Sequence, residues 1–122
     1  MANADIRVKR IYDPVEDGDG KRILIDRLWP RGMSKERAAL EAWMPDIGPS
    51  HALRKWYAHR PERWSAFCER YREELAGRNE LLQDLMDAAE EGPLTLLFSA
   101  TNRERNQAVI VRQLLQERCD SR

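Results

Sequence analysis

Two polar segments of the sequence combine residue types that bind anions. The first follows the apolar run 94–98 and leads into a predicted helix. A helix N-terminus presents unpaired amide N–H groups, to which this segment adds hydroxyl and amide donors. The candidate ligand-binding residues are Ser99, Thr101, Asn102 and Asn106. The segment suits a phosphate or carboxylate, although it lacks the glycines of a conventional nucleotide-binding loop.

The second segment, residues 26–32, reads Asp-Arg-Leu-Trp-Pro-Arg-Gly and follows another apolar run. Arg27 and Arg31 are candidates to clamp an oxyanion and stabilise its charge, and Asp26 is a candidate base or an orienting partner of Arg27. In the alternative interpretation, an Asp–Arg pair locks the loop while Trp29 fills the core. We expect Tyr12 and Asp13, at the end of the first predicted strand, to complete the pocket.

Thr101 and Glu104 also have the spacing of a capping box. In this interpretation they only open the last helix, because a capping threonine and a glutamate three residues later satisfy each other's backbone donors. The sequence therefore predicts that the last helix begins directly after Thr101.

A third region, residues 53–64, alternates basic and aromatic side chains. An alternative function is a non-enzymatic module in which residues 21–37 and 54–72 present a basic and aromatic face to nucleic acid or a protein partner. The spacing of Trp56, Tyr57 and Trp64 is also that of an amphipathic helix, which favours rings packed in the core and charges at its rim.

Apolar periodicity supplies the elements that must position these groups. Strands are predicted at 6–12, 23–25 and 94–98, with a weak strand at 40–44. Helices are predicted after Ser34 and Ser50, over 61–75 and 81–89, and at the C-terminus. This order predicts one α/β domain over residues 1–122, a layered domain with a few-stranded, mostly parallel sheet flanked by helices. Polar exits of parallel strands then share one sheet edge, where ligands bind in such folds.

Composition narrows the function classes. The 122 residues carry 21 basic and 21 acidic side chains, so no global charge attracts nucleic acid or anionic lipid. Apolar residues make up 42%, enough for a packed core. Two distant cysteines and two histidines do not form a metal motif, and no cofactor is implied. The absence of a leader or an apolar span predicts a cytoplasmic protein with no membrane partner.

The chain resembles the domain of unknown function 488 family of bacterial proteins, in its short YeaO-like branch. The resemblance covers nearly the whole chain and rests on residues 9–14, 25–32 and 53–56, on His59 with 61–64, and on 98–100 with Asn106 and 108–109. It implies a single α/β domain and no established reaction. It also favours a common site for the two polar strand exits, since these segments are the ones by which the family is recognised.

Other branches of the family carry a cysteine in the segment matching Ser99 and a Cys-His-Arg near the start of the last helix. Here Ser99 and the run Arg105-Asn106-Gln107 stand in that region, which argues against thiol or histidine chemistry. We therefore expect a small anionic ligand at the carboxyl ends of the strands, of a class that bears a phosphate or carboxylate group and includes nucleotide fragments. Catalysis, the ligand's identity and the oligomeric state are left open by the sequence.

Overall fold

The computed structural model describes residues 4–121 and has four parallel strands in one sheet, in the order β1-β4-β2-β3. The strands are β1 (Ile6–Arg10), β2 (Lys21–Leu24), β3 (Ala42–Trp43) and β4 (Leu94–Phe98). The helices are α1 (Lys35–Ala38), α2 (His51–Tyr57), α3 (Trp64–Ala76), α4 (Asn79–Glu90) and α5 (Gln107–Asp120). Short 3-10 turns cover Asp17–Asp19, Pro45–Ile47 and Pro61–Arg63. The predicted α/β class and mostly parallel sheet are confirmed.

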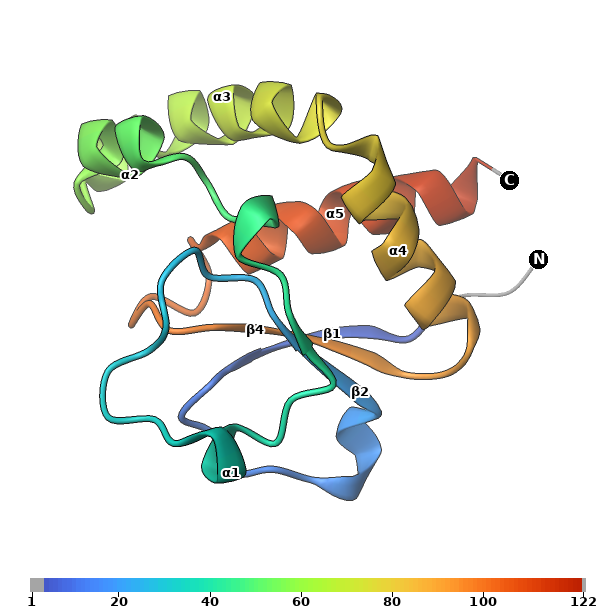
Figure 1. The fold of residues 1–122 in the computed structure, drawn as a ribbon. Helices are drawn as coiled ribbons and strands as arrows, with labels where there is room; N and C mark the ends of the chain where they lie inside the picture. Colours follow the sequence, from blue (N-terminus) through green and yellow to red (C-terminus); the bar gives the residue numbers. More distant parts are fainter. Residues whose placement is uncertain (1–3, 122) are drawn as a thin grey trace.

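Both faces of the sheet are covered, as parallel sheets require. Helices α2 to α5 lie on one face, and α1 lies on the other (Figure 1). Side chains alternate accordingly along β4, because successive residues of a strand point to opposite faces. Leu96 and Phe98 join the large core beneath the helices, whereas Leu97 joins a small core with Met33 and Ala38.

The carboxyl ends of β1, β4 and β2 meet at one edge of the molecule (Figure 1). This follows from the register, in which Leu97 of β4 pairs with Lys9 of β1 and with Leu24 of β2. The segments after β2 and β4 therefore leave the sheet side by side, as the sequence predicts for parallel neighbours. Within residues 4–121 there is no helix with the length and apolar character that a bilayer crossing requires.

The start of the last helix differs from the prediction. Helix α5 begins at Gln107, and its N-cap is Asn106, whose Oδ1 accepts from the Val109 N–H at 3.2 Å. The expected capping box of Thr101 and Glu104 is wrong, because these residues lie in an exposed loop before the helix. Asn102 organises that loop instead, because its Oδ1 accepts from the Glu104 N–H and from the Arg105 N–H, each at 2.9 Å. Asparagine suits both positions, since it caps helices and forms Asx turns.

Candidate functional site at the carboxyl edge of the sheet

Asp26 stands at the centre of the edge and joins the exits of β2 and β4. Its Oδ2 accepts from the Ser99 N–H at 3.0 Å and from the Ser99 hydroxyl, and its Oδ1 accepts from the Gln107 side-chain amide. The side chain is buried, with 7% of the residue exposed. We call Asp26, Ser99, Gln107 and the nearby Arg54 the Asp26 cluster. The predicted meeting of Asp26 with Ser99 is thus present in the geometry.

Burial raises the pKa of the Asp26 carboxyl, because desolvation disfavours its charged form. The hydrogen bonds from Ser99 and Gln107 and the positive charge of Arg54 oppose this rise in pKa. Asp26 forms no ion pair with Arg27, so neither the orienting role nor the locking Asp–Arg pair considered from the sequence is found. Asp26 instead connects two strand exits and the first turn of α5.

Arg54, on α2, is the unsatisfied member of the cluster. Its Nε is buried and has no hydrogen-bond acceptor among the described residues. Its charge nevertheless acts on Asp26 and lowers the pKa of that carboxyl. Helix α2 is fixed in place by its N-cap Ser50, which accepts from the Leu53 N–H and donates to Glu74 of α3. The guanidinium is therefore held beside the strand exits by a rigid helix and not by a flexible loop.

Arg27 has a structural position that differs from the predicted oxyanion clamp. Its Nε donates to the carbonyl of Pro49 at 3.0 Å and its Nη2 to that of Gly48 at 2.7 Å. Arg78 donates to the same Gly48 carbonyl at 2.8 Å, and the Tyr71 hydroxyl to that of Ile47 at 2.7 Å. These donors fix the loop that precedes α2 and so determine where Arg54 lies.

We expect the Arg27→Ala variant to lose about 2 kcal/mol of its free energy of unfolding, because the buried Pro49 carbonyl loses its donor and the Gly48 carbonyl keeps only Arg78. Arg31→Ala is the matched control, since the exposed Arg31 side chain has no hydrogen-bond or ion-pair partner within residues 4–121. It should change stability by less than about 0.5 kcal/mol. Urea unfolding of both variants measures the difference. An Arg27→Ala protein of normal stability that no longer binds anions would instead place Arg27 in a ligand site.

The other predicted residues lie at the same edge but brace its loops. The Tyr12 hydroxyl donates to the Arg31 carbonyl at 2.9 Å, which joins the exits of β1 and β2. Asp13 forms a two-bond ion pair with Arg103, at 2.8 Å for each bond, and this pair lowers the pKa of Asp13. Thr101 is exposed. These contacts position the loops at this edge of the sheet.

Sequence reasoning missed Gln107, Arg54 and Arg10. Arg10 donates to the carbonyls of Ala100 at 2.9 Å and Ser99 at 3.1 Å, and so supports the loop after β4. Gln107 is the first residue of α5, and a correct N-cap assignment to Asn106 would have placed it beside the strand exits. Arg54 carried no local signal, because a helical arginine usually points to solvent.

Several members of the basic and aromatic face expected from 21–37 and 54–72 make internal contacts. The guanidinium carbons of Arg63 and Arg70 lie 5.0 and 4.1 Å from the centre of the Trp56 ring. Tyr57 and Trp64 pack against the large core, as the amphipathic interpretation predicts. In the 21–37 region, Lys21 pairs with Glu91 and Arg22 with the buried Asp19. These rings and charges therefore already make contacts within the domain.

The described residues contain no group of three or more histidine, cysteine, aspartate or glutamate side chains placed to hold a metal ion.

The fold and this edge define a four-stranded parallel α/β domain with a hydrogen-bonded carboxylate between two strand exits. Residues 5–122 match the family model described as "Inactive DUF488-N3 subclade". The chain belongs to the DUF488 family, as its resemblance to that family predicts.

Relatives span almost the full chain. The uncharacterised protein YeaO of Escherichia coli strain K12 is 45% identical over 107 residues, which cover 88% of this chain and 93% of that protein. The uncharacterised protein Rv3073c of Mycobacterium tuberculosis strain H37Rv is 36% identical over 113 residues, covering 93% and 95%. The uncharacterised protein Mb3100c of Mycobacterium bovis shows the same 36% identity. No solved structure matches the chain.

Proposed function

We propose that the protein is a non-catalytic binding domain that holds a small anion, a phosphate or carboxylate group, at the carboxyl edge of its sheet. One observation carries this proposal. The guanidinium of Arg54 lies beside the strand exits with a buried Nε–H that has no acceptor among the described residues. A buried donor without an acceptor costs free energy, which an oxyanion at Arg54 would recover.

Charge at the edge supports the same ligand class. Arg105 is exposed at the end of the loop after β4. Burial raises the pKa of Tyr57 on α2, and the positive charge of Arg105 opposes this rise, so Arg105 lies near that helix. Arg54 acts on Asp26, and Arg105 precedes Gln107 by two residues, so both bring positive charge to this edge. Guanidinium groups bind carboxylate and phosphate oxygens through paired N–H donors.

Two features favour binding without chemistry. Three hydrogen bonds already occupy the buried Asp26 carboxyl, which suits a structural connection better than a general base. The family model is described as an inactive subclade. The resemblance to the family further implies that Ser99 lies in the segment where other branches carry a cysteine. The candidate roles of Asp26 as base and of Arg27 and Arg31 as charge stabilisers are therefore replaced in this proposal by anion binding at Arg54.

The test is a titration of the isotope-labelled protein with sodium sulfate, followed by the backbone amide resonances at constant ionic strength. We expect saturating shifts at Arg54, Ser99 and Gln107, and none when chloride replaces sulfate. Sulfate near Asp26 raises the proton affinity of that carboxyl, so the affinity should increase as pH falls through the upshifted pKa of Asp26. Shifts that do not saturate, or that appear only elsewhere, would reject the proposal.

A further inference from the structure

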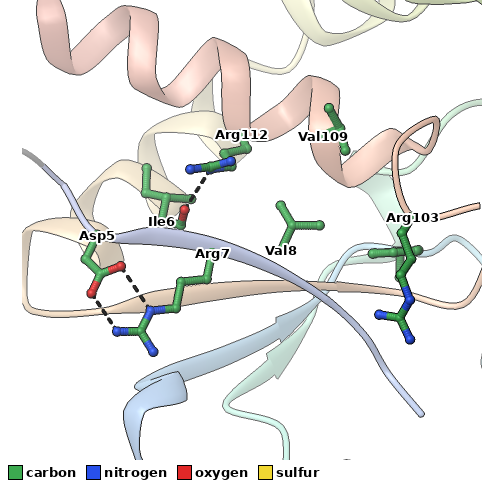
Figure 2. A pocket seen from close by; sticks show the side chains of 8 residues that line it. Asp5, Ile6, Arg7, Val8, Arg103, Val109 and Arg112 are labelled. Atoms are coloured by element: carbon green, nitrogen blue, oxygen red, sulfur yellow. Dashed lines mark hydrogen bonds and ion pairs between the residues drawn. The ribbon is translucent and has the colours of Figure 1, made fainter. Parts of the chain in front are cut away.

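A second hollow lies between β1 and α5, at the outer edge of the sheet, and is independent of the anion site proposed above. Its volume is about 460 Å³. Val8, Phe98 and Val109 provide its apolar lining. Arg112 and Val109 reach toward it from α5, Arg103 stands at one end, and the paired Asp5 and Arg7 lie toward the other (Figure 2). A shallow space of this size accepts one side chain or a short segment of a ligand.

The backbone of β1 is open toward this hollow. In a parallel ladder, alternate residues direct both backbone groups to the same neighbour. The Asp5 carbonyl accepts from Leu94 at 2.9 Å and the Ile11 N–H donates to Phe98 at 2.8 Å, so the odd-numbered residues of β1 face β4. The even-numbered residues face outward. The Val8 N–H and C=O therefore have no partner among the described residues.

The ends of this open edge are closed. The Ile6 carbonyl accepts from the Arg112 Nε at 2.8 Å. At the other end, the Arg10 N–H donates to the Asp13 carboxylate at 3.1 Å, and the Arg10 carbonyl accepts from the Asp13 N–H at 3.0 Å. The unpaired part of the β1 backbone is thus a short stretch centred on Val8, and this limits an added strand to a few residues.

Charge selects the kind of strand that fits. Arg112 uses only its Nε internally, so its terminal nitrogens have no acceptor among residues 4–121. If β1 of a second copy of the chain paired antiparallel to β1 and centred on Val8, Arg7 would lie opposite Lys9. Like charges directly opposite each other are destabilising. An acidic strand avoids this repulsion, because one of its carboxylates can pair with Arg112 and another can approach the half-exposed Arg103, which already pairs with Asp13. The carboxylate of Asp5, which also lines the hollow, is neutralised by its pair with Arg7.

We propose that β1 accepts a short extended acidic segment of a protein partner as an added strand. The Val8 backbone groups hydrogen-bond to that segment, one of its apolar side chains covers Val8 and Val109, and carboxylates on either side reach Arg112 and Arg103. Strand addition of this kind derives its affinity from main-chain hydrogen bonds and its specificity from the side chains beside them.

The experiment titrates the full-length labelled protein with the capped pentapeptide Glu-Thr-Val-Thr-Glu. We expect saturating shifts of the Val8 amide, no binding of the matched peptide Lys-Thr-Val-Thr-Lys, and roughly fivefold weaker binding when the central valine is N-methylated, since one backbone donor is lost. Arg112→Gln should weaken binding, whereas Arg118→Gln on the same helix should not. An unmoved Val8 amide, equal binding of the lysine peptide, or an equal shift with glutarate alone would overturn the proposal.

Discussion

The Asp26→Ala variant is expected to lose about 3 kcal/mol of its free energy of unfolding, since three donors lose one buried acceptor. The Ser99 N–H is then buried without a partner, and the exit of β2 is no longer tied to the exit of β4 or to Gln107. Asp26→Asn should lose only about 1 kcal/mol, because an amide oxygen can accept from Ser99 while the amide nitrogen faces a rotated Gln107. Urea unfolding compares the two variants.

The difference in free energy of unfolding between the natural protein and Asp26→Asn should depend on pH with a definite sign. Burial raises the pKa of Asp26 in the folded state, so between the unfolded and folded pKa values the folded protein binds more protons. The contribution of Asp26 to stability is therefore largest at acid pH and falls as pH rises through its folded pKa. The stability of the natural protein relative to Asp26→Asn should decline over that window. A difference that grows with pH, or an alanine variant of normal stability, contradicts the assigned role.

The Arg54→Gln variant is expected to bind sulfate at least tenfold more weakly, by about 1.5 kcal/mol or more, because a charged donor to the anion is removed. Its stability should change little, since the guanidinium makes no hydrogen bond among the described residues. Lys55→Gln is the matched control. It removes one positive charge from the next residue of α2, which is exposed, and should alter the sulfate affinity by no more than about twofold.

Equal losses of affinity in the Arg54 and Lys55 variants would point to long-range attraction in place of a contact. Unchanged sulfate affinity in both variants would show that Arg54 does not contact the anion. The same titrations at two ionic strengths separate these outcomes, because screening weakens exposed charges more than partly buried ones.

Much of the fold follows from local patterns. The apolar runs before Asp26 and Ser99 become neighbouring interior strands, and Ser34 and Ser50 cap helices as their types predict. Parallel pairing then brings Asp26 to Ser99. This part of the site was predictable because it needs only strand identity and a parallel sheet.

The missed features depend on contacts that the sequence does not encode locally. Arg27 binds the carbonyls of Gly48 and Pro49, and backbone acceptors more than 20 residues away carry no sequence signal. The burial of the Arg54 Nε depends on the position of α2, which packs against α3. For the last helix, Thr101 and Asn106 both satisfied the capping preferences, and only the turn formed by Asn102 decides between them.

The most direct measurement of the central claim is the side-chain Nε–Hε resonance of Arg54 during a sulfate titration. If an anion satisfies this buried donor, the resonance shifts downfield, saturates together with the Ser99 and Gln107 amides, and exchanges more slowly with water. A resonance that stays in place while those amides move would show that sulfate binds elsewhere at the edge. A titration without any saturating shift would show that this edge does not bind the anion.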